Sequence, residues 1–424
     1  MIYLDNSATT RPFDEVIDKM SACMREEYFN PSAVYAPAML AGRILTETRE
    51  AIASQLGGRV KVMFTSGGTE ADNLALLGTA RALRGRKGHF ITTKVEHPAI
   101  LETAAELERL GHSVTYIGVD EEGTVDVDAL VDAVREDTAL VSVMQVNNEV
   151  GAVMPIEEIS RRVKEKNPRT LIHVDGVQGF MRVPMHMNRI GVDLYSLSGH
   201  KIHGPKGIGA LAMSDRARPL CIAFGGGQEN GLRSGTENVP GIAGLGQAVR
   251  AFARLDDPAS DMMELKMRLR DGILQAVPDA KVNGPTGGAP HILNVTFPVK
   301  GEVLLHALEF GWYDTVQYPW TSQSSEEELE LLRFCTDVQM GSISAPPDTL
   351  PEDFAKEQAF LQAFDGHLSL WKLDEALTDG LGGLAHGGVL VGGDGHDDHL
   401  DGGDGRGQAQ AVVVAVGHDD RADE

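Results

Sequence analysis

The chain has 424 residues, with 62 acidic and 38 basic side chains, so its formal net charge at pH 7 is −24. This length allows two or three domains and a large core. The acidic balance argues against nucleic-acid binding, and the sequence has no run of 18 apolar residues that would indicate a membrane span.

The charge is unevenly distributed along the chain. Residues 1–307 contain 38 acidic and 33 basic side chains, whereas residues 308–424 contain 24 acidic and only 5 basic ones. The first three quarters therefore have the composition of an ordinary enzyme, and the last quarter differs from it.

The cysteines are few and widely spaced. Cys23, Cys221 and Cys335 are odd in number, which argues against a disulfide framework. The first residues, Met-Ile-Tyr-Leu-Asp-Asn, contain no basic or apolar signal region. Together these features predict a cytoplasmic location.

From residue 12 to residue 213, helical and strand-like patterns alternate. Such alternation predicts an α/β fold in which helices cover both faces of a mostly parallel sheet. Helical periodicity is expected over 12–27, 36–56, 69–84, 98–110, 126–136 and 155–167. Seven strands are expected at Lys61–Phe64, Phe90–Lys94, Val114–Val119, Leu140–Val146, Leu171–Val174, Leu194–Leu197 and Gly209–Met213.

The pattern changes after residue 240. Residues 240–275 are predicted to be helical with a break at Asp256-Asp-Pro, and residues 291–297 form a strand. We therefore predict a large domain over 1–255, whose first ~15 residues pack on a smaller domain that starts with residues 256–307.

Two further segments have unusual composition. Residues 308–375 are acidic and atypical, and residues 376–424 are rich in Gly, Asp and His, with twelve glycines between 380 and 407. The tail carries too little apolar surface to offset the entropy of ordering it, so we expect disorder. Residues 392–400 are similar to a calcium-binding repeat, but no matched second copy follows and no calcium site is predicted.

Two segments carry the strongest chemical signal. Ser196-Leu-Ser-Gly-His-Lys201 and His173-Val-Asp175-Gly-Val-Gln178 each follow a short apolar run that is typical of a buried parallel strand. Ligands bind where such strands end. A lysine and a neighbouring aspartate there suit pyridoxal phosphate, because the lysine binds the cofactor and the carboxylate keeps the pyridine nitrogen protonated. A surface lysine and a helix-capping aspartate are the alternative.

Polar motifs occur at other strand ends. Ser66-Gly-Gly-Thr-Glu70 opens a helix and suits a phosphate, although ordinary helix initiation gives the same pattern. His97 lies at a strand-to-helix junction, where it could stack on a cofactor ring or be purely structural. Asn147-Asn-Glu-Val-Gly151 would bring amides to the same edge, and Arg233-Ser-Gly-Thr236 is an anion contact or a flexible linker.

A metal site is not predicted. His200 and His203 have the spacing His-x-x-His, but no third ligand lies near them in the sequence.

Taken together, the order and spacing of six motifs resemble the cysteine desulfurases of the class V aminotransferase group. The resemblance begins at Tyr3-Leu-Asp-Asn-Ser-Ala-Thr-Thr, continues through His291-Ile-Leu-Asn-Val and Gly301-Glu-Val-Leu-Leu-His, and covers about residues 1–307. It implies the fold of a fold-type I pyridoxal phosphate-dependent transferase with an incomplete smaller domain. It also implies a homodimer, L-cysteine as substrate, and a sulfur acceptor or iron–sulfur scaffold protein as partner.

The resemblance also implies roles for individual residues. Lys201 would bind the cofactor covalently, and His97 would stack on its ring and take part in proton transfer. Asp175 would pair with the pyridine nitrogen, and Gln178 would hydrogen-bond the ring phenolate. Asn148 would lie beside the substrate amino acid. Phosphate contacts would come from Gly68, Thr69, Ser198, His200 and, from the other subunit, Thr236.

The chain departs from the family after residue 307. The family's sulfur-accepting cysteine lies in a small-residue loop, but the corresponding stretch here, Asp314–Gln323, has no cysteine. The family's substrate-binding arginine also has no counterpart, since residues 334–371 contain no Arg. Cys335 has the spacing of a core-facing helix residue.

Residues 308–345 resemble instead a piece of an aldo/keto reductase barrel. We interpret the chain as a desulfurase truncated near residue 307 and joined to foreign or frame-shifted sequence, with a divergent but intact C-terminal domain as the alternative.

Two functions of different class follow. The first is a cysteine desulfurase, in which a thiolate takes the sulfur of L-cysteine and alanine is left. The second is a cofactor-binding protein or truncated product without activity. A lyase or aminotransferase of the same fold is a related alternative.

Overall fold

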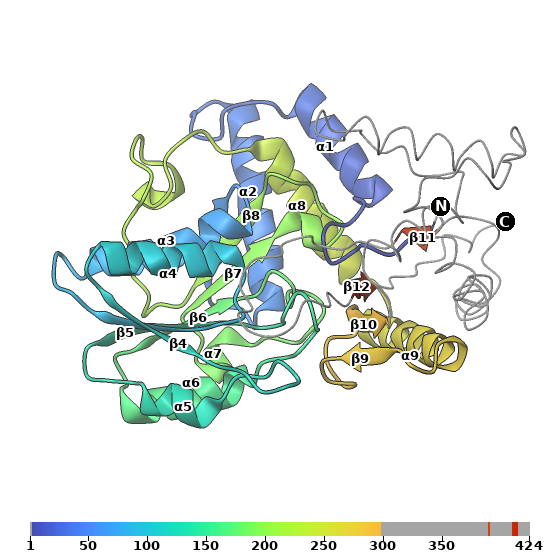
Figure 1. Ribbon diagram of the computed structural model, residues 1–424. Coiled ribbons are helices and arrows are strands. Elements are labelled where there is room, and N and C mark those ends of the chain that lie inside the picture. Colours follow the sequence, from blue (N-terminus) through green and yellow to red (C-terminus); the bar gives the residue numbers. More distant parts are fainter. Residues whose placement is uncertain (1, 298–388, 391–408, 414–424) are drawn as a thin grey trace, which may run out of the picture.

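The computed structural model describes residues 2–297, 389–390 and 409–413, and its centre is a seven-stranded sheet (Figure 1). The strand order is β2-β8-β7-β6-β5-β3-β4. Neighbouring strands are parallel except where β8 pairs with β2 and β7, so the predicted mostly parallel sheet is confirmed. The strands are β2 (Lys61–Thr65), β3 (His89–Thr93), β4 (Ser113–Ile117), β5 (Thr138–Met144), β6 (Leu171–Asp175), β7 (Leu194–Ser198) and β8 (Gly209–Met213).

Helices cover both faces of this sheet because most of its strands, such as β2, β5 and β8, carry buried apolar side chains on both faces. Along β2, Val62 and Phe64 join one buried cluster and Met63 joins another, as the alternation of side chains in a strand requires. One face is covered by α3 (Gly68–Ala82) and α4 (Pro98–Arg109). The other is covered by α2 (Ala36–Gln55), α5 (Val127–Asp132), α6 (Ile156–Lys166), α7 (Met187–Ile190) and α8 (Val239–Phe252), with α1 (Asp14–Glu26) packed on α8.

Local hydrogen bonds explain where two of the helices begin and end. The side chain of Asp126 accepts the Ala129 N–H at 2.9 Å and caps α5. The same helix ends earlier than predicted, because the Arg135 N–H donates to the Thr138 hydroxyl at 2.7 Å and closes a turn. The predicted break after α8 is present, and α9 (Pro258–Ala276) begins after Asp257, whose side chain accepts the Ser260 N–H at 3.3 Å.

A second sheet lies outside the main one (Figure 1). It contains β9 (Lys281–Asn283), β10 (Leu293–Phe297) and β12 (Ala409–Val413), paired antiparallel in the order β12-β10-β9. A two-stranded parallel pair joins β1 (Ile2–Tyr3) to β11 (Val389–Leu390).

Within residues 376–424 the structure describes only β11 and β12, and the expected disorder of this tail stays a prediction. The extended conformation of β12 suits its composition, since the segment runs into consecutive valines. Most of the tail, the atypical segment 308–375 and Cys335 lie outside the described residues.

The N-terminal segment is attached to the large domain. The N–H of Thr10 donates to the carbonyl of His200 at 2.9 Å, and the N–H of Phe13 donates to that of His203 at 3.1 Å. Its expected packing on the smaller domain stays a prediction. Among the helices that the structure describes, none is both long and apolar enough to cross a bilayer.

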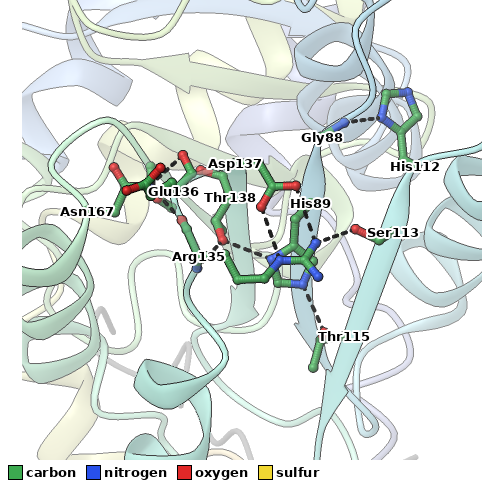
Figure 2. A network of polar contacts seen from close by, with 11 residues as sticks. Gly88, His89, His112, Ser113, Thr115, Arg135, Glu136, Asp137, Thr138 and Asn167 are labelled. Carbon is green, nitrogen blue, oxygen red and sulfur yellow. Dashed lines mark hydrogen bonds and ion pairs between the residues drawn. The ribbon is translucent and has the colours of Figure 1, made fainter.

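A polar network joins β3, β4 and β5 at the edge where these strands start (Figure 2). The buried His89 ring lies 2.9 Å from the Thr138 hydroxyl through Nδ1 and 2.9 Å from the Thr115 hydroxyl through Nε2. Arg135 donates to the Asp137 carboxylate at 3.1 Å and to the Ser113 hydroxyl at 2.5 Å. This network holds the three strands together at the edge opposite to Asp175 and Ser198.

Candidate functional site

The two segments with the strongest chemical signal meet where β6 and β7 end. Asp175 is the last residue of β6 and pairs with Ser196 of β7, and the short 3-10 helix Gly199–Lys201 follows that strand directly. The amine of Lys201 donates to the backbone carbonyls of Ser7 and, at 2.9 Å, of Ala8. The sheet therefore brings the lysine and the aspartate to one edge, as the sequence predicts.

Asp175 is a buried carboxylate. Its Oδ1 accepts the Val177 N–H at 2.9 Å. Burial raises the pKa of Asp175, and the Val177 hydrogen bond and the charges of His97 and Lys201 act in the opposite direction. A cationic group beside this carboxylate would favour its ionised form.

Gln178 is held by the N-terminal segment. Its side-chain nitrogen donates to the carbonyl of Ser7 at 2.9 Å, across 171 residues of sequence. The same carbonyl accepts Lys201, so Ser7 joins the two side chains. Sequence reasoning missed Ser7 because its contribution is a backbone oxygen, which no side-chain pattern reports.

The N-terminus of α3 lies beside these strand ends. Gly68 begins the helix, and a Cβ built at this glycine would lie 3.7 Å from the Cβ of Ser198. Thr69 is exposed in the first turn. The N–H groups of a first helical turn have no partner within the helix and favour an anion.

Glu70 completes this helix start. Its carboxylate accepts the Ser66 N–H at 2.6 Å and a hydrogen bond from Nε of Arg233 at 2.9 Å. The latter bond ties the glycine-rich loop before α8 to the N-terminus of α3.

The remaining predicted residues lie around this centre. Nδ1 of His200 lies 3.2 Å from the Thr9 hydroxyl, and burial, with the charge of Lys201 as the next cause, lowers its pKa to about 4. Thr236 is exposed on the loop between β8 and α8, and Asn148 is half-buried after β5. These two are not joined to Lys201 by a hydrogen bond that the structure describes.

His97 caps α4 and is exposed. Its Nδ1 accepts the Ala99 N–H at 3.1 Å, so Nε2 carries the proton of the neutral ring. The ring is thereby fixed as a donor through Nε2 at a strand end.

Three buried titratable groups behind Asp175 were missed by the sequence reasoning. Glu96 accepts the Thr93 hydroxyl at 2.8 Å and the Met144 N–H at 3.0 Å, and burial raises its pKa to about 8. Burial and then the charge of Asp175 raise the pKa of Asp72 well above its usual range. Burial lowers the pKa of His173 to about 3.

Two of these groups, Glu96 and His173, carry a signal in the sequence. Glu96 directly precedes His97, and His173 stands two residues before Asp175, each in or beside an apolar strand. A polar residue that faces the core beside a site is itself informative.

The donor set fits pyridoxal phosphate. An amine, a buried carboxylate that a cation would keep ionised, and an open helix N-terminus occur together at one sheet edge. Covalent attachment, a partner for the pyridine nitrogen and an anion site are what this cofactor needs.

Comparisons with known proteins agree with this chemistry. The chain matches the family "Aminotransferase class-V" over residues 2–308. It is 42% identical to "Cysteine desulfurase" of Trichormus azollae over 314 residues, and this aligned stretch covers 73% of this chain and 77% of the relative. It is 41% identical over 335 residues to "Cysteine desulfurase IscS" of Dictyoglomus turgidum, with 78% and 84% coverage.

Solved structures agree as well. A "NIFS-like protein" superimposes with a TM-score of 0.70 at 35% identity, over 81% of this chain and all of that one. A structure described as "SspA in complex with cysteine" has a TM-score of 0.65 at 32% identity, with 78% and 92% coverage.

The match to the family ends at residue 308, one residue beyond the boundary predicted from composition and motifs. Its members depend on pyridoxal phosphate. The fold, the lysine and aspartate at neighbouring strand ends and the similarity over most of the chain lead to one conclusion. The chain belongs to the class V aminotransferase family, among its pyridoxal phosphate-dependent cysteine desulfurases.

Proposed function

We propose that this chain binds pyridoxal phosphate through Lys201 and takes L-cysteine as its substrate, and that it releases sulfur poorly. The observation that carries the proposal is the pair of Lys201 and Asp175 at the ends of adjacent strands. The names of the relatives supply the reaction, and one similar solved protein is described with cysteine bound.

The residues around Lys201 act on the amino-acid substrate and on protons. When bound, pyridoxal phosphate supplies an electron sink for bonds broken next to the amino group. Asp175 would pair with the pyridine nitrogen and keep its proton, and Gln178 would donate to the ring phenolate. Lys201 and His97 move protons, and the donor at Nε2 of His97 suits this role.

The phosphate is held at the start of α3. Gly68 and Thr69 supply its N-terminus, and Ser198 and His200 flank it from the β7 edge. Thr236 would reach the phosphate of a second copy, and Asn148 would lie beside the substrate amino acid.

The second copy makes a homodimer. Two segments, residues 28–40 and 220–224, expose large apolar side chains. These are Tyr28, Val34, Tyr35, Met39 and Leu40 on the first segment and Leu220 and Phe224 on the second. An open pocket of about 780 Å³ is lined by Pro31 and Ser32 of the first segment and by Gly227–Asn230, which follow the second, so the two loops approach each other. Exposed large apolar side chains suit a protein interface.

The dimer can be tested by ultracentrifugation. Val34 is 97% exposed, so Val34→Glu costs the folded monomer little and should halve the sedimenting mass. Mixing Lys201→Ala with Thr236→Ala chains should restore one intact site per hybrid dimer. A wild-type chain that sediments as a monomer overturns the proposal.

Sulfur release should be poor because neither of the two cysteines that the structure describes is an exposed thiol. Cys23 is fully buried, and burial raises its pKa, so it is a poor nucleophile. Cys221 is half-buried in the loop after β8. Residues 308–334 contain no cysteine, and residues 334–371 contain no arginine to bind the substrate carboxylate.

We propose that residues 308–424 are foreign to the family, because the family match ends at residue 308. Resequencing the gene across the codons for residues 300–320 tests this. We further propose a cytoplasmic enzyme by descent, whose ancestor supplied sulfur for iron–sulfur clusters, as the name IscS of several relatives suggests.

Two measurements test the proposed function. The purified chain with pyridoxal phosphate should show a visible absorbance band that is absent in Lys201→Ala. A folded wild-type chain without this band overturns the cofactor assignment.

Sulfide and alanine released from L-cysteine in the presence of a reductant test turnover. We expect a spectral change on adding L-cysteine and negligible sulfide. Robust turnover that is lost in Cys335→Ser would show that the C-terminal segment supplies the thiol.

A further inference from the structure

Arg182 is a buried cation in the turn after β6. Only 3% of its surface is exposed, and burial lowers its pKa to about 10. No carboxylate among the described residues lies within ion-pair distance of it. Its Nη2 donates to the carbonyl of Lys201 and its Nη1 to Oε1 of Gln178 at 3.5 Å. A buried charge that no carboxylate of the described residues pairs is costly, and its two hydrogen bonds offset part of that cost.

His291 contacts the same oxygen of Gln178. It precedes β10 and is buried, and its Nε2 lies 3.4 Å from Oε1 of Gln178. Oε1 has no hydrogen to give, so Nε2 of His291 must carry the proton. Its Nδ1 has no hydrogen-bond partner in the part of the chain that the structure describes, which fits a bare nitrogen.

These contacts fix the orientation of the Gln178 amide. Its oxygen faces two donors, Arg182 and His291, and its nitrogen donates to the carbonyl of Ser7. Turning the amide over would place N–H groups against the guanidinium and an oxygen against the Ser7 carbonyl. The contacts to Arg182 and to Ser7 would then become repulsive, and His291 would have to carry its proton on Nδ1.

One N–H of Gln178 remains for a ligand. A primary amide has two N–H groups, and Ser7 accepts only one of them. The second N–H is on the same Gln178 nitrogen. This nitrogen and the Lys201 amine donate to the same Ser7 carbonyl, so the second N–H lies on the side of the proposed cofactor.

We propose that Arg182 and His291 are positioning residues that hold the Gln178 amide with its nitrogen toward the cofactor, where it can only donate to an anionic ring oxygen. The inference rests on the proposed function for the identity of the ligand, but not for the orientation of the amide. Arg182 also places a positive charge behind the carbonyl of Lys201. Both effects favour negative charge on the ring oxygen and disfavour a second positive charge at the lysine nitrogen.

The orientation can be measured without cofactor. In the chain labelled with 15N-histidine, the resonance that disappears in His291→Asn belongs to His291. We expect a neutral ring protonated only at Nε2 from pH 8 to pH 5. In Arg182→Met the amide is freed to turn, and we expect a mixture of the two tautomers. An unchanged pure Nε2–H form in folded Arg182→Met would overturn the role of Arg182, and a wild-type ring protonated at Nδ1 would overturn that of His291.

The consequence for the cofactor is read from its spectrum. We expect the pKa of the visible chromophore to rise by about one unit in Arg182→Met, since a buried charge and an oriented donor are lost together. Arg182→Lys keeps the charge and should restore most of the shift. Arg189→Met, on the exposed part of α7, is the matched control and should titrate like wild type.

The outcomes separate the two proposals. A wild-type chain without a visible band overturns the proposed function, and the histidine resonances still decide the orientation. A wild-type band whose pKa is the same in folded Arg182→Met overturns the inference alone.

Discussion

Gly68 and Val177 are in such close contact that a Cβ built at position 68 would lie 2.5 Å from Cγ2 of Val177. The start of α3 is thereby pressed against the turn that follows Asp175. The proposed phosphate site and the proposed partner of the pyridine nitrogen are positioned by one packing contact.

Replacing Gly68 by Ala should therefore damage the proposed cofactor site. The methyl group must push the start of α3 away from Val177, which moves the N–H groups of its first turn. We expect pyridoxal phosphate to bind at least about tenfold more weakly, measured by titration of the visible band. Gly118→Ala, where a Cβ meets no atom within 4 Å, should bind like wild type. Equal affinity in the two variants would contradict this account.

Glu96→Gln should make the fold less sensitive to alkali. In the folded chain the pKa of Glu96 is about 8, whereas the usual pKa of a glutamate is 4.5. The folded state therefore binds more protons than the unfolded state between these pH values, and stability falls as the pH rises. Glu96→Gln has no proton to lose at this position. Between pH 6.5 and 8 its free energy of unfolding should therefore fall by about 2 kcal/mol less than that of the wild-type chain. Urea unfolding at the two pH values measures it, with exposed Glu102→Gln as control. An unaltered pH slope would show that Glu96 is ionised in the folded state.

His89 should contribute to unfolding in acid. Burial, followed by the charge of Arg135, lowers its folded pKa from 6.5 to about 4. The unfolded chain therefore binds a proton first, and stability that is complete above pH 6.5 is lost as pH falls to 4, by about 3 kcal/mol. In His89→Gln this part of the pH dependence should vanish, although the variant is less stable at pH 7. The exposed His186→Gln should keep the wild-type slope, and the same slope in all three proteins would refute the prediction.

Tyr195→Phe should destabilise the core behind the site. The hydroxyl of this fully buried residue donates to Oε1 of Gln145 at 2.6 Å, and its removal leaves that oxygen without the donor. We expect a loss of about 1–3 kcal/mol in the free energy of unfolding, measured with urea. Tyr116→Phe removes an exposed contact to Glu108 and should cost much less. A neutral Tyr195→Phe would mean that another donor replaces the hydroxyl.

Much of the fold was readable from the sequence. Every predicted strand of the main sheet is present, because fully buried parallel strands produce apolar runs that stand out between amphipathic helices. The placement of Lys201 near Asp175 follows from the same rule, since parallel strands end at one edge. The antiparallel direction of β8 could not be read, because an apolar run is the same in either direction.

The sequence by itself determined the elements, the edge at which they end and the residues offered there. Only the tertiary structure decided how those residues are held. Ser7 meets Gln178 across 171 residues, and His291 reaches the same amide from the turn before β10. The proton on Glu96 and the tautomer of His291 depend on burial and on the partners that folding supplies. Local sequence encodes propensity and periodicity, whereas the energy of a buried polar group is set by neighbours that are distant in the chain.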